Sequence, residues 1–142
     1  GGEIPTGHYA AENMKKTVVP GRNTIFNSVL MGLAESHGFD RVLVGAHSGD
    51  HHIYPDCRPG YLSSMEQAFY HATEGKVTFE SPFATWDKAK ILKLGYELGV
   101  DYSLTRTCYT SDKIACGKCG SCSERLEAFQ MIGRADPLEY AT

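Results

Sequence analysis

Four of the five cysteines lie within fifteen residues of one another, near the end of the sequence. Their spacing is Cys-x7-Cys-x2-Cys-x2-Cys, formed by Cys108, Cys116, Cys119 and Cys122. Gly117 and Gly120 give the backbone the freedom for the tight turns that bring each sulfur back toward one point. Four thiolates so placed are a typical ligand set of a structural Zn²⁺ ion. Because a full thiolate set leaves no position for water, we expect this metal to order the loop and not to perform chemistry.

Two alternatives to zinc stay open. An iron–sulfur cluster also takes four thiolates and uses the same Cys-x2-Cys-x2-Cys spacing. The other alternative is a set of unpaired or redox-active thiols. The cationic residues Lys113, Lys118 and Arg125 would offset the charge of four thiolates, although placement on the surface also explains them.

A polar segment from Asp50 to Pro59 holds carboxylates, an aromatic ring and a guanidinium group directly after an apolar run. In open α/β sheets, ligands bind beyond the carboxyl ends of the strands. The carboxylates of Asp50 and Asp56 can accept hydrogen bonds from the ring N–H and the exocyclic amine of a guanine-like base. Tyr54 would stack on such a base, and Arg58 would pair with a carboxylate or a phosphate. The alternative is a capped, solvated turn built of Asp and Pro.

Histidines and the fifth cysteine occur in the same region. His47, His51 and His52 surround Asp50 and would make a second metal site, but a polar pocket or a surface position is the ordinary use of such histidines. Cys57 has no partner cysteine, so we interpret it as a small packing residue and not as a nucleophile.

The composition is that of a globular protein of one domain, with 142 residues, 42% hydrophobic and 22% charged. There are 14 Lys and Arg against 17 Asp and Glu, and the net charge of −3 gives no sign of direct nucleic-acid binding. No apolar stretch is long enough to cross a bilayer, and the N-terminus does not resemble a secretion signal, so we expect no membrane association. Clustered cysteines in odd number fit a reducing compartment, and we interpret the protein as cytoplasmic.

The elements that position these residues follow from hydrophobic periodicity. Helical spacing predicts helices over about 24–37, 62–73, 86–98 and 124–132. Two short runs predict strands at 41–46 and 76–80, the first of them apolar on both faces as in a buried parallel strand. Residues 1–23 are predicted as an ordered loop or a linker, and 47–59 as a loop at the end of a strand.

Helices and strands that alternate along a chain are typical of a parallel sheet flanked by helices. We therefore predict an α/β fold, with a single domain over residues 1–142 and a zinc-binding motif at 108–122. No internal repeat or low-complexity tract interrupts this domain.

Several motifs occur together in an order that resembles one known family. They are Val19–Asn23 (Val-Pro-Gly-Arg-Asn), Tyr54–Pro59 (Tyr-Pro-Asp-Cys-Arg-Pro) and the cysteine motif with its Cys-Gly-Lys-Cys-Gly-Ser-Cys end. Lys88–Ile91, the Leu-Gly pairs at 94–95 and 98–99, and the Asp-Pro pair at 136–137 agree as well. Over nearly the whole chain the sequence resembles the 7-cyano-7-deazaguanine synthase (QueC) family of the PP-loop ATP pyrophosphatase superfamily.

The resemblance implies a Rossmann-like enzyme of queuosine biosynthesis, a ligase that forms carbon–nitrogen bonds. Family members use ATP and Mg²⁺ to convert 7-carboxy-7-deazaguanine and ammonia into 7-cyano-7-deazaguanine. They adenylate the carboxylate, admit ammonia to form the amide, and then activate and dehydrate that amide. The implied partners are therefore small molecules. The sequence leaves the oligomeric state open, a homodimer included.

The same resemblance implies roles for individual residues. Arg22 and Asn23 would lie near the nucleotide, and four residues would surround the deazaguanine: Asp50, Tyr54, Asp56 and Arg58. Lys88 would begin a helix that faces the site and would stabilise phosphate charge, with a solvent-facing position as the alternative. Lys88 and Asp56 are the implied catalytic residues, and the four clustered cysteines match the zinc ligands of the family.

Two departures from the family pattern stand out. Gly60 replaces a residue that is usually acidic after Arg-Pro, which alters a loop expected to contact substrate. The family also begins with a strand and a Ser-Gly-Gly-x-Asp-Ser loop that wraps the pyrophosphate of ATP, and nothing in this sequence corresponds to it. We therefore interpret the chain as the C-terminal portion of a longer enzyme, incomplete at its N-terminus. We predict that it does not turn over ATP by itself.

Two other functions stay open. One is a non-catalytic, zinc-stabilised module that binds a deazapurine, a nucleotide or a protein partner. The other is a tRNA-thiolating enzyme of the same superfamily, which would need a reactive cysteine and a basic face. The net charge of −3 argues against the second.

Overall fold

The computed structural model describes residues 3–110 and 113–141. The chain divides into two compact units, a continuous unit, Val19–Thr85, and a split unit that joins Gly1–Val18 to Trp86–Thr142. Residues 111 and 112 of the predicted motif at 108–122 lie outside the described residues. The prediction of a single domain over 1–142 stays a prediction.

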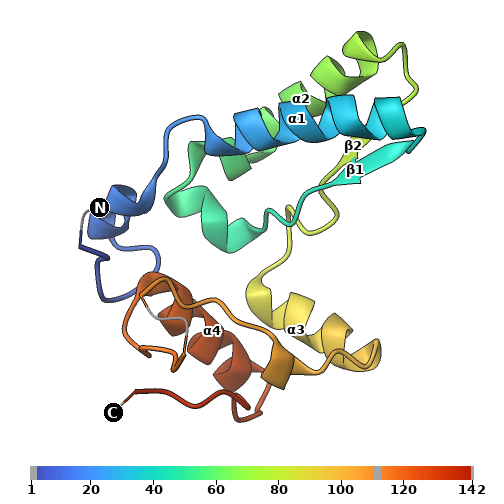
Figure 1. The fold of residues 1–142 in the computed structure, drawn as a ribbon. Helices are drawn as coiled ribbons and strands as arrows, with labels where there is room; N and C mark the ends of the chain where they lie inside the picture. The colour runs from blue at the N-terminus through green and yellow to red at the C-terminus, as the bar shows by residue number, and fades with distance from the viewer. Residues whose placement is uncertain (1–2, 111–112, 142) are drawn as a thin grey trace. The chain divides into compact units, whose positions relative to one another are not determined.

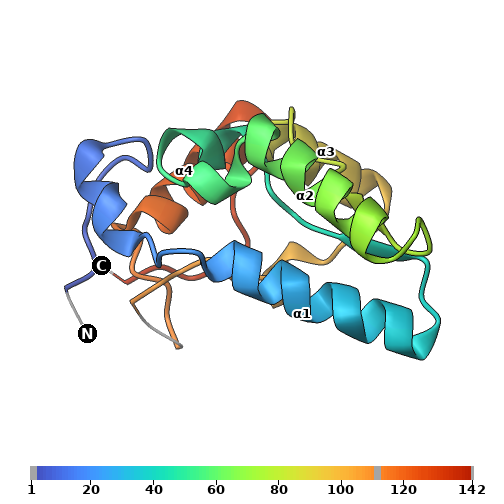
Figure 2. The same ribbon diagram turned by 90° about the horizontal axis from the view of Figure 1, so that it is seen from above.

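The continuous unit is a two-stranded parallel sheet with helices packed on it (Figure 1). Its elements are α1 (Arg22–His37), β1 (Arg41–Leu43), the 3-10 helices η2 (Ser48–His52) and η3 (Pro55–Cys57), α2 (Pro59–Ala72) and β2 (Thr78–Glu80). Val42 of β1 lies opposite Phe79 of β2. Figure 2 shows α1 and α2 running lengthwise beside each other. This arrangement confirms the predicted α/β class.

The core of the continuous unit lies between the strands and these helices. Val42 and Phe79 are the buried residues of the strands, and the Phe79 ring packs on Phe69 of α2 with 5.0 Å between centroids. Leu43 points the other way and is 58% exposed. The structure therefore differs from the predicted strand over 41–46 with two buried faces, because the strand ends at Leu43 and one face is uncovered within the described residues.

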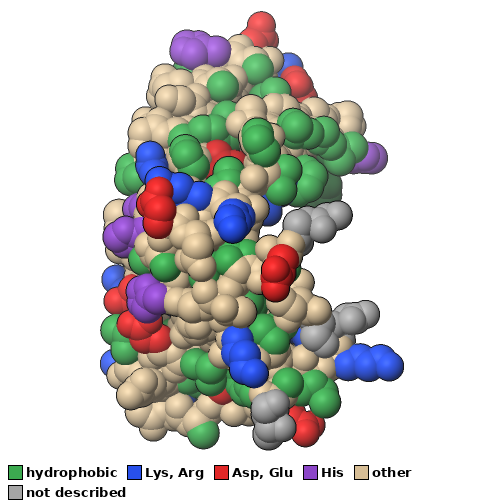
Figure 3. Space-filling model, turned by 90° about the vertical axis from the view of Figure 1, so that its left-hand side faces the viewer, with side chains coloured by type: hydrophobic (Ala, Val, Ile, Leu, Met, Phe, Trp, Pro, Cys, Tyr) green, Lys and Arg blue, Asp and Glu red, His purple; other side chains and the backbone are tan. Residues whose placement is uncertain are grey.

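Helix α1 confirms the helix predicted over 24–37, but its apolar stripe does not form the core. The helix follows Gly21 and stops at Gly38, whose φ values of 67° and 74° are left-handed and favour glycine. Asn27 and Ala34 are the residues that it buries. The stripe is instead 43–61% exposed, and consists of Ile25, Phe26, Val29, Leu30 and Leu33. Figure 3 shows hydrophobic side chains gathered over this helix, at the upper right.

The split unit is built around two packed helices. Its elements are η1 (Glu12–Thr17), α3 (Lys88–Glu97), η4 (Tyr102–Leu104) and α4 (Gly120–Met131). Helices α3 and α4 bury a small cluster formed by Ala89, Leu92, Ala128 and Phe129. Gly95 permits the close approach of Tyr102, since a Cβ atom at Gly95 would lie 1.8 Å from the Tyr102 hydroxyl. No helix within residues 3–110 and 113–141 is both long and apolar enough to cross a membrane.

The segments predicted as loops contain more structure than expected. Residues 12–17 form η1, which buries Met14, and α1 already begins at Arg22. The predicted loop at 47–59 contains η2, η3 and the first residue of α2. Helix α4 begins inside the cysteine motif, at Gly120. Single 3-10 turns and helix starts at proline or glycine carry little periodic signal, which is why hydrophobic spacing misses them.

Candidate metal centre and substrate loop

The four clustered cysteines come together in the split unit. Their Sγ atoms all lie within 4.8 Å of one another, those of Cys116 and Cys122 are 4.0 Å apart, and no disulfide joins them. A tetrahedral Zn²⁺ ion with Zn–S bonds of about 2.3 Å needs sulfur atoms about 3.8 Å apart. An iron–sulfur cluster places several atoms between its thiolates and so needs more room. The geometry therefore fits one Zn²⁺ ion held by Cys108, Cys116, Cys119 and Cys122.

Backbone amides donate hydrogen bonds to sulfur atoms of the cluster, among them those of Cys116 and Cys108. The amides of Lys118 and Cys119 donate to Cys116 Sγ at 3.4 and 3.3 Å. The Cys116 amide donates to Cys108 Sγ at 3.3 Å. Gly117, with a φ of 67°, makes the turn that aims these amides. Such donors favour the thiolate form and orient the metal ligands.

The thiols differ in pKa because their surroundings differ. Burial and the hydrogen bond with the neighbouring Cys119 thiol raise the pKa of Cys122. Burial also acts to raise the pKa of Cys116, but hydrogen bonds from the Thr110 hydroxyl and from backbone amides outweigh it and lower that pKa. A bound divalent cation favours the thiolate form of its ligands. Metal binding should therefore release protons, from Cys122 in particular.

The N-terminal segment is part of this centre, which sequence reasoning missed. The Gly7 amide donates to the Lys118 carbonyl at 2.9 Å, and the Ser123 hydroxyl donates to the Gly7 carbonyl at 3.0 Å. Gly120 permits the contact with η1, because a Cβ atom there would lie 2.9 Å from Met14 Sδ. These contacts join segments far apart in the sequence, so local periodicity carries no sign of them.

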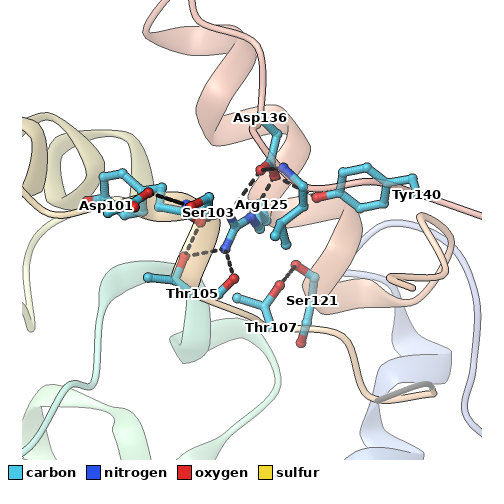
Figure 4. Close-up of polar contacts among 10 residues, drawn as sticks. Asp101, Ser103, Thr105, Thr107, Ser121, Arg125, Asp136 and Tyr140 are labelled. Carbon is cyan, nitrogen blue, oxygen red and sulfur yellow. Dashed lines mark hydrogen bonds and ion pairs between the residues drawn. The ribbon is translucent and has the colours of Figure 1, made fainter. Parts of the chain in front are cut away.

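Arg125 is the buried centre of a polar network in the same unit (Figure 4). Its guanidinium donates to both carboxylate oxygens of Asp136, at 2.6 and 2.9 Å. It also donates to the Thr105 hydroxyl at 2.8 Å and to the Tyr102 carbonyl at 3.0 Å. The Tyr140 hydroxyl donates to Asp136 at 2.6 Å. Arg125 thus ties α4 to two other segments, and its burial contradicts the surface position given as the alternative, while compensation of the thiolate charge stays a prediction.

The pairing keeps both members of this network charged. Burial acts to raise the pKa of Asp136, but the hydrogen bonds from Arg125 and Tyr140 outweigh it and lower that pKa. Burial likewise acts to lower the pKa of Arg125, and its bond to Asp136 raises it. The two side chains are only 4% and 2% exposed. Removing either partner would leave the other as a buried, unpaired charge.

In the continuous unit, three predicted site residues meet at the start of α1. The Asn23 amide donates to the Asp56 carboxylate at 3.3 Å, and Arg22 Nε donates to the Asn23 side-chain oxygen at 3.4 Å. Gly21 has no side chain to cap the helix, so Asp56 supplies the acceptor that a helix N-terminus requires. The Asn23 side-chain amide donates to Cys57 Sγ at 3.4 Å. The structure therefore brings Arg22, Asn23 and Asp56 together.

Cys57 lies in the core of the same unit. Burial, with the nearby charges of Asp50 and Asp56, raises the pKa of its thiol to about 12. Such a thiol stays protonated at neutral pH and is a poor nucleophile. This environment supports the interpretation of Cys57 as a packing residue.

The rest of the predicted substrate segment folds back on itself. The Asp50 carboxylate accepts from the His47 amide at 3.1 Å and caps η2. Arg58 Nε donates to the His51 carbonyl at 3.0 Å, and Tyr54 packs against the core. The capped-turn alternative thus describes part of the segment, and a substrate role for these residues stays a proposal.

Lys88 begins α3 in the split unit, as the sequence predicts, but it does not face solvent. Its ammonium forms an ion pair with Glu124 of α4, and the two side chains are 20% and 13% exposed. Asp87 caps the helix by accepting from the Lys90 amide at 2.7 Å. Lys88 therefore contacts the helix that starts in the cysteine motif. The other two cations predicted near the thiolates, Lys113 and Lys118, are exposed.

The histidines are not gathered into a second metal site. Within the described residues, the cysteine cluster is the one group of three or more His, Cys, Asp or Glu side chains that could hold a metal ion. His47 Nδ1 instead accepts from the Gly49 amide at 3.1 Å. His51 Nε2 is buried and has no hydrogen-bond partner in the described part of the chain.

Together, the parallel sheet, the helix-capping polar loop and the cysteine cage define an α/β protein with four converging cysteines that could hold a metal ion. A family model described as "Queuosine biosynthesis protein QueC" matches residues 1–133. The chain belongs to this family, which confirms the resemblance and does not support the tRNA-thiolating alternative.

The chain is also similar to curated proteins named 7-cyano-7-deazaguanine synthase. It is 52% identical to that of Pseudoalteromonas atlantica over 97% of this chain and 63% of the relative. It is 48% identical to that of Methanoregula boonei over 97% of this chain and 64% of the relative. The corresponding protein of Caldicellulosiruptor saccharolyticus is 47% identical over 96% and 61%. The chain therefore spans less than two thirds of the length of these relatives.

Proposed function

We propose that this chain forms part of a 7-cyano-7-deazaguanine synthase, an ATP-dependent ligase that converts 7-carboxy-7-deazaguanine and ammonia into 7-cyano-7-deazaguanine in queuosine biosynthesis. The names of relatives at 47–52% identity support this reaction. Because the chain covers only 61–63% of those relatives, we further propose that it is inactive by itself. Five free cysteines support a reducing, cytoplasmic setting.

The observation that carries the proposal is the cysteine cage. All four cysteines of the motif converge to within 4.8 Å in a chain that matches the family over residues 1–133. Zn²⁺, when bound, would cross-link the loop and leave no open coordination position. Helix α4 begins inside this loop, and its residues Glu124 and Arg125 hold Lys88 and Asp136. The metal would therefore hold the start of α4 in place, and with it the partners of Lys88 and Asp136.

The segment after β1 is proposed to hold the substrate. Asp50 and Asp56 would accept hydrogen bonds from the deazaguanine, and Tyr54 would contact its ring. Within the described residues, the Arg58 guanidinium is bonded only through Nε. Its terminal amino groups are therefore available to pair with the carboxylate of the substrate.

The start of α1 is proposed to face the nucleotide. Arg22 places positive charge there, which suits phosphate groups. ATP with Mg²⁺, when bound, would supply the adenylyl group: a carboxylate oxygen then leaves as part of AMP, pyrophosphate having been released, and the carboxyl carbon becomes open to attack by ammonia. Lys88 would stabilise phosphate charge; in this structure its ammonium pairs with Glu124. Asp56 and Lys88 remain the proposed catalytic residues.

The test is a chimera in which this chain replaces the matched region of the Pseudoalteromonas atlantica relative. Formation of 7-cyano-7-deazaguanine and release of pyrophosphate are measured with 7-carboxy-7-deazaguanine, ammonia and Mg-ATP. We expect product from the chimera and none from the isolated chain. A folded, zinc-loaded chimera that makes no product would contradict the proposed function, and turnover by the isolated chain would contradict its inactivity alone.

A non-catalytic module is the second candidate. The observation that favours it is a polar loop that partly satisfies its own hydrogen bonds, through Asp50 and Arg58. Calorimetry with 7-cyano-7-deazaguanine and with ATP separates the candidates. A module used only for protein contacts would bind neither.

A further inference from the structure

A groove of about 370 Å³ lies at the carboxyl end of β2, wholly within the continuous unit. One of its walls is the first part of α2, which contributes Pro59, Leu62, Ser63 and Glu66. These positions follow the i, i+3, i+4, i+7 spacing of a single helix face. The wall is therefore set by the helix itself and not by a loop.

The opposite wall comes from the end of β2 and the turn after it, including Phe79, Glu80 and Ser81. The Ala84 amide closes this turn by donating to the Ser81 carbonyl at 3.1 Å. Phe79 and Leu62 are each 4% exposed and give the groove an apolar floor. An apolar floor with a few polar groups, in a volume of roughly 300–1,000 Å³, is typical of a small-molecule site.

The charged residues of this groove are both carboxylates. Glu80 is already engaged, because it accepts from the Thr78 hydroxyl at 3.3 Å and lies 3.9 Å from Arg41 Nε. Glu66 forms no hydrogen bond or ion pair within the described part of the chain. No Lys, Arg or His lines the groove. It therefore disfavours phosphate or carboxylate groups and favours a ligand edge that donates hydrogen bonds.

We propose that this groove binds the guanine-type edge of the deazaguanine, with Glu66 accepting from the ring N–H and the exocyclic amine. This inference rests on the proposed function, but it assigns that edge to Glu66, outside the segment from Asp50 to Arg58, and leaves the five-membered-ring N–H of the base to Asp50 and Asp56. The groove has the position expected of a ligand in an open α/β sheet, beyond the carboxyl end of a strand. The flat ring lies on Phe79 and Leu62, and the substituent at position 7 points outward, away from the carboxylates.

The donor pattern also sets the specificity of the groove. A guanine-type edge presents two adjacent donors, which match the two oxygens of one carboxylate. An adenine edge presents one donor beside an acceptor, so a carboxylate facing it leaves one oxygen opposite a lone pair. Glu66 therefore selects 7-cyano-7-deazaguanine over adenine.

The test is calorimetric binding of 7-cyano-7-deazaguanine to the zinc-loaded chain and its variants. Glu66→Gln should weaken binding at least about tenfold, since it removes a charged hydrogen-bond acceptor. Ser63→Phe, at an exposed position of α2, should block the groove without disturbing the core. Glu97→Gln, which removes the same charge from an exposed residue of α3, is the matched control and should bind like the unmodified chain. Circular dichroism checks that each variant is folded.

Each outcome decides a separate point. If Glu66→Gln and Ser63→Phe both bind normally while Arg58→Ala does not, the groove is overturned and the proposed function stands. If the groove variants lose binding but the chimera makes no product, the groove stands and the proposed function fails. Equal binding of adenine, or no binding by the unmodified chain, would overturn the groove assignment.

Discussion

At the scale of single residues, the Arg125–Asp136 pair is where one substitution should cost the most stability. Asp136→Ala leaves a guanidinium that is buried with its main partner removed. We expect the free energy of unfolding to fall by about 3–5 kcal/mol. Urea denaturation of the zinc-loaded chain measures this, with the exposed Glu139→Ala as control. A loss no larger than that of the control would contradict the role given to Asp136.

The same pair predicts how stability depends on pH. The pKa of Asp136 is lowered in the folded chain, where the bonds from Arg125 and Tyr140 outweigh burial. Its stabilisation is therefore complete above the unfolded pKa, about 3.9, and is lost as the pH falls through the lower folded value. The difference in unfolding free energy between the unmodified chain and Asp136→Asn should be constant near neutral pH and shrink in acid. If this difference grew in acid, the lowered pKa of Asp136 in the folded chain would be contradicted.

Cys57, the one cysteine outside the proposed metal ligands, should be unreactive in the folded, metal-loaded chain. Its pKa is raised from 9.0 to about 12, which leaves about a thousandfold less thiolate at neutral pH. We expect iodoacetamide to label Cys57 only after unfolding, as read by mass spectrometry of its peptide. The guanidinium-unfolded chain is the control, and rapid labelling of the native protein would contradict this environment.

At the scale of elements, Gly95 tests the packing of Tyr102 on α3. A methyl group at this position would meet the Tyr102 hydroxyl, 1.8 Å from the new Cβ atom. Gly95→Ala should therefore destabilise the chain by about 1–3 kcal/mol, although alanine favours a helix. Gly60→Ala in α2 is the matched control, because its Cβ would meet nothing within 4 Å. Thermal unfolding of both variants measures the difference.

The sequence predicts elements well where periodicity is strong and poorly where contacts are long-range. The four helices and both strands occur near their predicted positions. The spacing of the α1 stripe predicts a helix, but it carries no information about which side faces the sheet, and the buried side proves to be that of Asn27 and Ala34. The start of α4 at Gly120 is hidden because the residues that begin it also belong to the cysteine motif.

In the candidate site, too, features that depend on local spacing could be predicted and those that depend on long-range contacts could not. The cysteines could be predicted, because metal ligation imposes a local spacing that survives in the sequence. The hydrogen bond from Asn23 to Asp56 and the ion pair of Lys88 with Glu124 could not, since each joins residues more than thirty positions apart. Such pairs depend on the packing of whole elements. The sequence therefore predicts which residues belong to the candidate site, but not which residues they bond to in the folded chain.

At the scale of the whole molecule, removal of the metal should affect one unit more than the other. The cysteine cage lies in the split unit, whereas Val19–Thr85 has its own buried core. We expect chelation, or Cys108→Ser, to remove amide-exchange protection from residues 4–14 and 115–132 and to leave that of α2 and β2 largely intact. The unmodified, zinc-loaded chain is the control with all metal ligands present. Equal loss of protection in both units would contradict this division.

The split unit also has a consequence for the order of events during synthesis on the ribosome. Its two parts are joined by contacts such as that between Gly7 and Ser123, which are 116 positions apart. Val19–Thr85 is continuous and can fold as soon as it emerges, while the segment around Gly7 must wait for Lys118 and Ser123. Capture of the ion therefore follows the folding of Val19–Thr85, and a polypeptide stalled before Cys122 would lack both the fourth metal ligand and the Ser123 partner of Gly7.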